Sequence, residues 1–333
     1  MILNLVSCDD IEKGEIYLGT EINTSSHDML DKVIPRNSSY IFFFLMTVPV
    51  FLGTSYAAAK IGMRELAPLN LAILRFVTAS LIFTIILLGM KSNSKIDRAD
   101  IPRFIVLGFM AITSFFYIHF SGLQYTTSTN AGLIMATSPV FAAIFCTFSG
   151  RERVNRLAII GIFVAFFGVS LVITQGNLGG IFQQKNLMGD ILILSNALVW
   201  AGVTIYGTTL LKKYRPFVAM AYIHIFGTAL LLPFAFLPSM FVEIPLISQL
   251  SIITWPTMLS ALYLAVFCSV YSYFIWYAGV ERLGAVKTAV FNYFNPIFAV
   301  LSGIFLFGEE LTAYTILGGL LVIVGVYTTN NNK

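Results

Sequence analysis

Charged residues are scarce in this sequence. Asp, Glu, Lys and Arg together make up 11% of the 333 residues, whereas hydrophobic residues make up 57%. Soluble globular domains carry about 25% charged residues, and a soluble protein of this size would struggle to bury 30 phenylalanines. The deficit excludes a soluble globular protein and predicts a chain that crosses the lipid bilayer several times.

Cysteine and histidine are also scarce. The three cysteines are odd in number and far apart, so neither a disulfide framework nor a cysteine metal site is expected. The three histidines have no histidine or acidic partner at ligand spacing, so we expect no metal. These residues are Cys8, Cys146, Cys268, His27, His119 and His224.

Two other signatures are missing. The sequence has no Gly-x-x-x-x-Gly-Lys loop, so ATP is not expected to drive the protein directly. The net charge of +4 comes from basic residues scattered over short loops instead of one face, which argues against a nucleic-acid partner. We therefore expect no cofactor and no nucleic acid.

Acidic residues are missing from the middle of every apolar run. Asp190, Glu281, Glu309 and Glu310 all fall at the ends of such runs. A buried carboxylate relay, which many proton pumps use, therefore has no evident carrier. Three alternatives remain: a histidine carries protons, a carboxylate at a helix end carries them, or the protein works without protons.

The apolar runs predict an all-α membrane protein. A spanning helix needs about 20 predominantly apolar residues, and by that rule we expect ten transmembrane helices. The expected spans are 40–59, 69–89, 102–122, 130–148, 156–174, 189–209, 218–237, 256–279, 286–306 and 312–328.

The tails and loops predict the orientation. Residues 1–39 are polar and acidic, which is typical of a disordered tail. Lys and Arg concentrate in the loops after the second, fourth, sixth and eighth spans, whereas the opposite side has only Lys60, Arg64 and Lys185. By the positive-inside rule, both termini are predicted to be cytoplasmic.

The two halves of the sequence are related. A shift of 157 residues aligns the prolines and glycines of the fourth and fifth spans with those of the ninth and tenth, and a shift of 149 residues aligns earlier positions. Because each half has five spans, an odd number, the second copy is predicted to be inverted in the membrane, with a substrate site near the midplane. The aligned pairs are Ser138-Pro139 with Asn295-Pro296, Glu152 with Glu309, Gly161 with Gly318, Gly168 with Gly325, Phe51 with Trp200, Gly53 with Gly202, and Arg75 with His224.

These features together carry a family resemblance. Two five-span halves, a proline in spans four and nine, Gly308-Glu309 after span nine and a glycine-rich last span resemble the EamA family of the drug/metabolite transporter superfamily. The resemblance implies EamA-like repeats at 40–175 and 188–328, and export of amino acids or related metabolites across the cytoplasmic (inner) membrane. It also implies that the last span of each half supports the fold or a homodimer. Phe51 departs from the tryptophan that is common in the first span of the family.

Three basic or titratable residues lie within spans. Arg75 is predicted either to bind a substrate carboxylate or to have a structural role near its helix end. His119 and His224 are predicted either to bind protons or substrate or to fill packing positions, and the alignment of His224 with Arg75 favours packing.

The two aligned prolines, Pro139 and Pro296, are predicted to kink spans four and nine and to free a backbone carbonyl. Asn292 and Asn295 adjoin the second kink, where they are expected to contact that carbonyl or a substrate. The alternative is a static kink that serves packing alone.

Four aromatic residues complete the expected cavity, because solute sites are mostly apolar and aromatic. They are Tyr56, Trp200, Tyr206 and Tyr271. Tyrosine and tryptophan also mark membrane interfaces, which is the alternative. Asn130 is predicted to be a helix N-cap, and Glu309 is predicted to cap the helix that follows it.

We thus predict a secondary transporter of a small organic solute, with no catalytic residue. The alternatives are a non-transporting membrane scaffold or sensor, which would use the acidic tail for interaction, and a membrane-embedded enzyme. An enzyme would need a converging nucleophile, base or metal set, and the sequence shows none.

Overall fold

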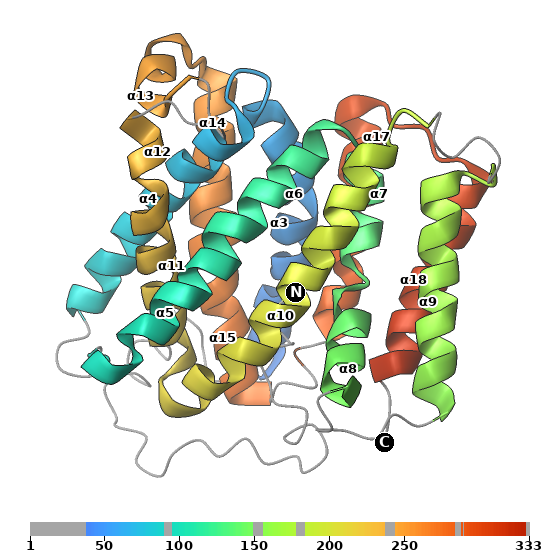
Figure 1. The fold of residues 1–333 in the computed structure, drawn as a ribbon, viewed down its shortest axis with the longest axis horizontal. Helices are drawn as coiled ribbons and strands as arrows, with labels where there is room; N and C mark the ends of the chain where they lie inside the picture. Colours follow the sequence, from blue (N-terminus) through green and yellow to red (C-terminus); the bar gives the residue numbers. More distant parts are fainter. Residues whose placement is uncertain are drawn as a thin grey trace.

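The computed structural model describes residues 38–89, 95–148, 156–177, 184–236, 244–283, 288 and 290–330. All regular structure in these ranges is helical (Figure 1). The predicted tail, Glu152 and Lys287 lie outside the described residues, apart from the last two residues of the tail.

The first half of the chain begins with two long helices and ends with another. Its elements are α3 (Ser38–Gly62), α4 (Pro68–Gly89), η3 (Arg98–Asp100), α5 (Ile101–Gly108), η4 (Phe109–Ser114), α6 (Phe115–Gln124), α7 (Ser128–Met135), α8 (Ser138–Phe148) and α9 (Arg156–Thr174).

The second half begins with the longest helix. Its elements are α10 (Leu187–Lys213), α11 (Pro216–Leu231), α12 (Pro233–Phe236), α13 (Leu246–Gln249), η6 (Leu250–Ile252), α14 (Trp255–Tyr263), η7 (Leu264–Tyr271), α15 (Ser272–Leu283), η8 (Val290–Phe294), α17 (Asn295–Phe307) and α18 (Ala313–Asn330).

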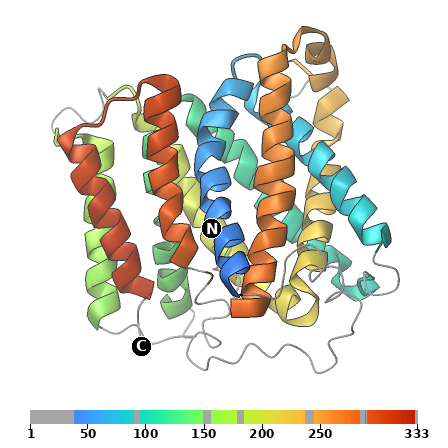
Figure 2. The same cartoon turned by 180° about the vertical axis from the view of Figure 1, so that it is seen from behind.

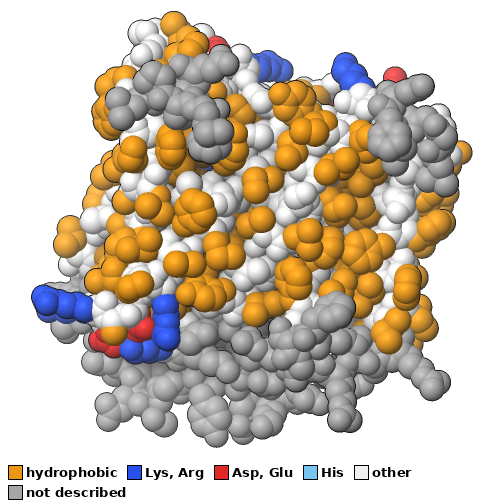
Figure 3. All heavy atoms as spheres, viewed as in Figure 1, with side chains coloured by type: hydrophobic (Ala, Val, Ile, Leu, Met, Phe, Trp, Pro, Cys, Tyr) orange, Lys and Arg blue, Asp and Glu red, His pale blue; other side chains and the backbone are white. Residues whose placement is uncertain are grey.

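Eight helical segments among the described residues are long and apolar enough to cross a membrane. Two more apolar segments, Phe291–Phe307 and Ala313–Thr329, are shorter. On the face shown in Figure 3, hydrophobic side chains cover the middle of the molecule and charged side chains lie at its two ends. This distribution is what a bilayer requires of a membrane-spanning protein.

Both predicted proline kinks coincide with a break between two helical segments. Pro139 is the second residue of α8, after a turn that separates α8 from α7. Pro296 is the second residue of α17 and follows the 3₁₀ segment η8. Proline is tolerated in a first helical turn because no intrahelical acceptor is needed for its missing N–H. Each proline therefore begins a new helix instead of bending a continuous one.

Each half also contains a π-helical segment at a comparable place. η4 joins α5 to α6 in the first half, and η7 joins α14 to α15 in the second. π-Bulges leave some carbonyls without their usual helical donor and occur frequently at functional sites.

Helices α9 and α18 pack closely along their length, as Figures 1 and 2 both show. A Cβ atom added at Gly161 would lie 2.7 Å from the carbonyl oxygen of Gly325, and one at Gly168 would lie 2.6 Å from that of Gly318. Gly161, near the start of α9, lies beside Gly325, near the end of α18, and Gly168 lies beside the earlier residue Gly318. The two helices are therefore antiparallel. Their small-residue faces are occupied within the chain, and a homodimer would have to use another surface.

We expect Gly168→Ala to destabilise the protein by about 1–3 kcal/mol, because the new methyl group meets rigid backbone and overpacking costs about that much. The measurement is the thermal unfolding of purified protein in detergent. Gly202→Ala in α10 is the matched control, since its Cβ would meet only the flexible tip of Met110, at 3.5 Å. Equal melting temperatures for the two variants would contradict the packing described here.

Candidate functional site

Arg75 lies in the buried middle of the molecule and joins its two halves. Its side chain extends from α4, is 5% exposed, and donates a hydrogen bond from Nε to Ser269 Oγ at 3.1 Å. Ser269 belongs to the π-helical segment η7, and its hydroxyl donates to the carbonyl of Leu264 at 3.2 Å. No carboxylate in the described part of the chain pairs with this guanidinium.

Two phenylalanine rings flank the Arg75 guanidinium. Its central carbon lies 5.0 Å from the ring centre of Phe76 and 4.6 Å from that of Phe116. A cation close to an aromatic face gains roughly 0.5–2 kcal/mol, more when it is desolvated. Neutral rings and one hydroxyl thus hold the charge in place, so an incoming anion would meet no competing carboxylate among these contacts.

His224 lies near this group, on α11. Its Nδ1–H donates to the carbonyl of Met220 at 2.8 Å, which leaves Nε2 as an acceptor. Nε2 is buried and has no hydrogen-bond partner among the described residues. The imidazole packs against the rings of Phe76, Phe83 and Tyr273, with ring centres 4.9–5.7 Å apart. The predicted packing role agrees with these contacts, and the free acceptor adds a polar group to the site.

His119 forms a second buried polar contact, between α6 and α10. Its Nδ1 lies 3.1 Å from Asn196 Nδ2, and the ring of Tyr56 on α3 lies 5.4 Å from the imidazole. Trp200 lies one turn further along α10, with its ring 4.9 Å from that of Phe115. Tyr56 therefore contacts His119 directly, and the ring of Phe115 lies between His119 and Trp200.

A small enclosed cavity lies beside Trp200, with Ala111, Val203, Met220 and Tyr273 in its wall. Its volume is about 10 Å³, which is close to the minimum that one water molecule needs. The described residues around this cavity therefore leave no room in it for an organic solute.

The remaining predicted residues are not part of this group. Tyr206 is 44% exposed on the outer surface of α10. The hydroxyl of Tyr271 lies 2.8 Å from Thr47 Oγ1 and ties η7 to α3. Asn295 Nδ2 donates to Asn292 Oδ1 at 3.3 Å, and Asn295 Oδ1 is buried without a partner in the described structure.

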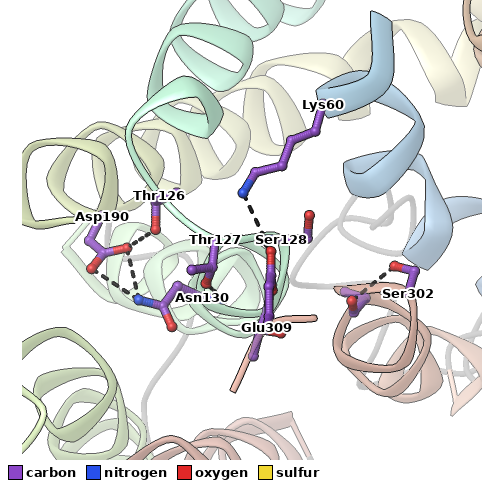
Figure 4. Close-up of polar contacts among 10 residues, drawn as sticks. Lys60, Thr126, Thr127, Ser128, Asn130, Asp190, Ser302 and Glu309 are labelled. Carbon is purple, nitrogen blue, oxygen red and sulfur yellow. Dashed lines mark hydrogen bonds and ion pairs between the residues drawn. The ribbon is translucent and has the colours of Figure 1, made fainter. Parts of the chain in front are cut away.

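A polar cluster surrounds the first turn of α7 (Figure 4). The carboxylate of Glu309 accepts hydrogen bonds from the backbone N–H groups of Ser128, at 2.7 Å, and Thr129, at 3.0 Å. Lys60 Nζ, from the end of α3, lies 3.4 Å from the same carboxylate. A carboxylate at a helix N-terminus satisfies free N–H groups and interacts favourably with the helix dipole.

The placement of Glu309 corrects one prediction. Glu309 caps α7 of the other half and not the helix that follows it. The chain reverses at Gly308, whose φ of +62° is a left-handed C-cap of α17, and glycine adopts this conformation without strain. Gly303 gives the carboxylate room, because a Cβ there would collide with Glu309 and with Thr129 Oγ1.

Asp190 lies on the other side of the α7 turn (Figure 4). It is 1% exposed, and its carboxylate accepts hydrogen bonds from the Thr126 hydroxyl and from Asn130 Nδ2, the latter at 3.2 and 3.3 Å. Asn130 was predicted to be the N-cap of this helix, but Thr127 fills that role by accepting from Asn130 N at 2.9 Å. The Asn130 side chain is therefore free to bind Asp190.

A second charged cluster joins the halves at the opposite end of the molecule. The carboxylate of Asp100 accepts from Lys213 Nζ and the Tyr214 hydroxyl, both at 2.6 Å, and from Arg103 at 3.1 Å. Lys213 also pairs with Asp97 at 2.5 Å. Hydrogen bonds to Asp100 and Asp97 raise the pKa of Lys213, so the ammonium stays charged throughout the physiological range.

Sequence reasoning missed several of these polar groups. Asp190 and Glu309 were recognised as acids at helix ends. The sequence did not show that both lie beside the start of α7, because this depends on how the two halves pack together. Ser269 and Asn196 gave no signal, because a serine or asparagine in an apolar helix is found in many structural settings. A search for polar residues within spans, without regard to charge, would have identified both.

Comparison with known proteins identifies the family. The sequence model of the EamA-like transporter family matches residues 39–174 and again residues 187–331. An uncharacterized transporter of Archaeoglobus fulgidus is 31% identical over 88% of this chain and 98% of its own length. A probable amino-acid metabolite efflux pump of Salmonella typhimurium is 28% identical over 86% of this chain and 93% of its own length.

A solved crystal structure shares the fold. It is 18% identical, covers 85% of this chain and 94% of its own length, and superimposes with a TM-score of 0.55. The two family matches together span most of the chain and correspond to its two halves, one on each side of residues 175–186. The protein is therefore a member of the EamA-like transporter family.

Proposed function

We propose that this transporter exports an amino acid or a related small organic metabolite across the cytoplasmic membrane by alternating access. The observation that carries the proposal is the buried Arg75 guanidinium, which bridges the halves and lacks a carboxylate partner among the described residues. A buried charge without a counterion is costly, and a substrate carboxylate would supply one. The name of the Salmonella relative, an amino-acid metabolite efflux pump, agrees with this substrate class.

The packing supports two inverted repeats of five spans each. Contacts between the halves occur in equivalent pairs: α3 packs on α17 as α10 packs on α8, and α6 packs on α10 as α15 packs on α3. Helices α9 and α18, which the sequence alignment treats as equivalent, are antiparallel neighbours. Equivalent helices that run in opposite directions are what an inverted repeat produces.

The two polar clusters support alternating access. At one end, Glu309 and Asp190 of the second half bind the α7 region of the first half. At the other end, Lys213 and Tyr214 of the second half bind Asp100 of the first. Transport by rocking of the halves requires each cluster to open in turn while the other stays closed. By the distribution of Lys and Arg in the loops, the α7 cluster faces outward and the Asp100 cluster faces the cytoplasm.

We expect Arg75→Gln to reduce solute flux about tenfold or more at low substrate concentration, since a lost hydrogen bond to a charged group costs about 1.5–3 kcal/mol. The measurement is efflux of labelled amino acids from proteoliposomes. Arg75→Lys should retain part of the flux because it keeps the charge but loses the planar fork. Arg64→Gln, at an exposed position, is the control. Wild-type flux in Arg75→Gln would exclude Arg75 as the carboxylate partner, and no wild-type flux of any solute would contradict the proposed function.

Removing the Glu309 carboxylate should loosen the outward end. We expect Glu309→Ala to lower the free energy of unfolding by about 0.5–2 kcal/mol, the usual cost of losing a helix cap. Glu310→Ala is the control, because Glu310 is exposed and next in sequence. Thermal unfolding in detergent distinguishes the two variants. If Glu310→Ala lowered the free energy of unfolding as much as Glu309→Ala does, the effect would not come from the cap on α7.

The orientation can be tested with single cysteines in a variant whose three native cysteines are replaced. A membrane-impermeant thiol reagent added to intact cells should label Glu310→Cys and not Arg98→Cys. Inverted membrane vesicles should give the opposite result. Labelling of Arg98→Cys from outside would reverse the proposed topology.

A further inference from the structure

Asp190 differs from the other described carboxylates in its surroundings. It is almost fully buried, and its hydrogen-bond donors are the hydroxyl of Thr126 and the amide of Asn130, both neutral. Glu309, by contrast, has Lys60 beside it, and Asp100 has Lys213 and Arg103. A buried carboxylate without a cation is strongly disfavoured in its ionised form.

The ionisable groups around Asp190 do not supply the missing charge. Lys60 and Glu309 pair with each other across the first turn of α7, and Lys185 is exposed before α10 begins. In the described structure, no hydrogen bond or ion pair joins Asp190 to the following ionisable side chains on the elements around α10: Arg103, His119, Tyr125, Tyr222 and His224. Tyr117, on α6, is a phenol and carries no positive charge.

The two donors and the acceptor belong to different halves. Thr126 and Asn130 lie just before and within α7, whereas Asp190 lies in the first turn of α10. Gly189 packs against the backbone of Gly122, Tyr125 and Thr126, so this contact is tight in the closed arrangement. Separation of the halves at this end would remove both donors and bring the carboxylate into water, where its ionised form is stable. The N-terminus of α10 favours the ionised form in both arrangements, so the difference between them comes from hydration of the carboxylate, which only opening provides.

We propose that Asp190, Thr126 and Asn130 form a proton-binding site that couples closure of the outward end to protonation. Closure takes up one proton on the Asp190 carboxylate, and opening releases that proton to the same solution. The inference rests on the alternating-access function proposed above. It predicts that rising external pH favours the open outward end, because only that state holds Asp190 as an exposed carboxylate.

The first test follows the outward end without any substrate. Ser128→Cys, in a variant without native cysteines, places a thiol at a position that is fully buried in the closed arrangement. Its labelling by an impermeant thiol reagent, relative to that of Glu310→Cys, should rise with external pH by up to tenfold per unit, the slope for one proton. Adding Asp190→Asn, which mimics the protonated carboxyl, should abolish this rise and keep labelling low. A pH-independent ratio in the parent variant, or an unchanged rise with Asp190→Asn, would overturn the proposal.

The second test observes the proton directly. The infrared spectrum of the purified protein at neutral pH should contain the C=O band of a protonated carboxyl group. Asp190→Asn should remove the band and Glu309→Gln should retain it, and thermal unfolding checks that both variants are folded. A band that persists in Asp190→Asn would overturn the assignment. Both tests need no transported solute, so their failure is separate from a failure to observe flux.

Discussion

The structure depends on one constraint, which is that polar groups inside a bilayer must find their partners within the protein. The observed partners fall into three layers. Charged residues form ion pairs at the two ends, Asp190 is satisfied by a hydroxyl and an amide just inside one end, and Arg75 in the middle contacts a hydroxyl and two aromatic rings. The partners that balance a buried charge thus change from opposite charges at the ends to neutral groups towards the centre. A site for a charged solute is expected where the protein's own compensation is weakest, and Arg75 occupies that place.

Glycine determines how rigidly the halves are joined. Gly161 and Gly168 bring α9 into a tight antiparallel contact with α18. Arg75 belongs to neither of these helices. Contacts between the halves near Arg75 are of another kind, built from aromatic rings and a single hydrogen bond. Close backbone packing resists sliding, whereas side-chain contacts can rearrange. The proposed alternating access would need such a rigid pair of helices beside a region that can rearrange.

The sequence was informative wherever the physical signal is local. Apolar runs located the helical segments, and the aligned glycines fall in α9 and α18, the two helices that pack closely against each other. Local signals failed at the ends of helices. Glu309 was expected to cap the next helix, because sequence proximity gave no better partner, yet it caps α7, 181 residues away. The prolines were recognised, but the sequence did not show that the chain breaks before them and that each one begins a new helix.

The candidate site shows the same limit in another form. Trp200 and Tyr206 were both chosen by residue type, but Trp200 is buried whereas Tyr206 is exposed. Residues 200 and 206 are six positions apart, or about 600° around a helix with 3.6 residues per turn, which places them on different faces of α10. Helical periodicity alone could have separated them once one face was known to be buried. That face could not be known from a helix that is apolar all round, because in a membrane the lipid-facing and protein-facing sides have similar composition. The packing of the two halves against each other therefore decides which side chains reach the site. The hydrogen bonds of Arg75 with Ser269 and of Asp190 with Asn130 form only when the halves are packed in this way.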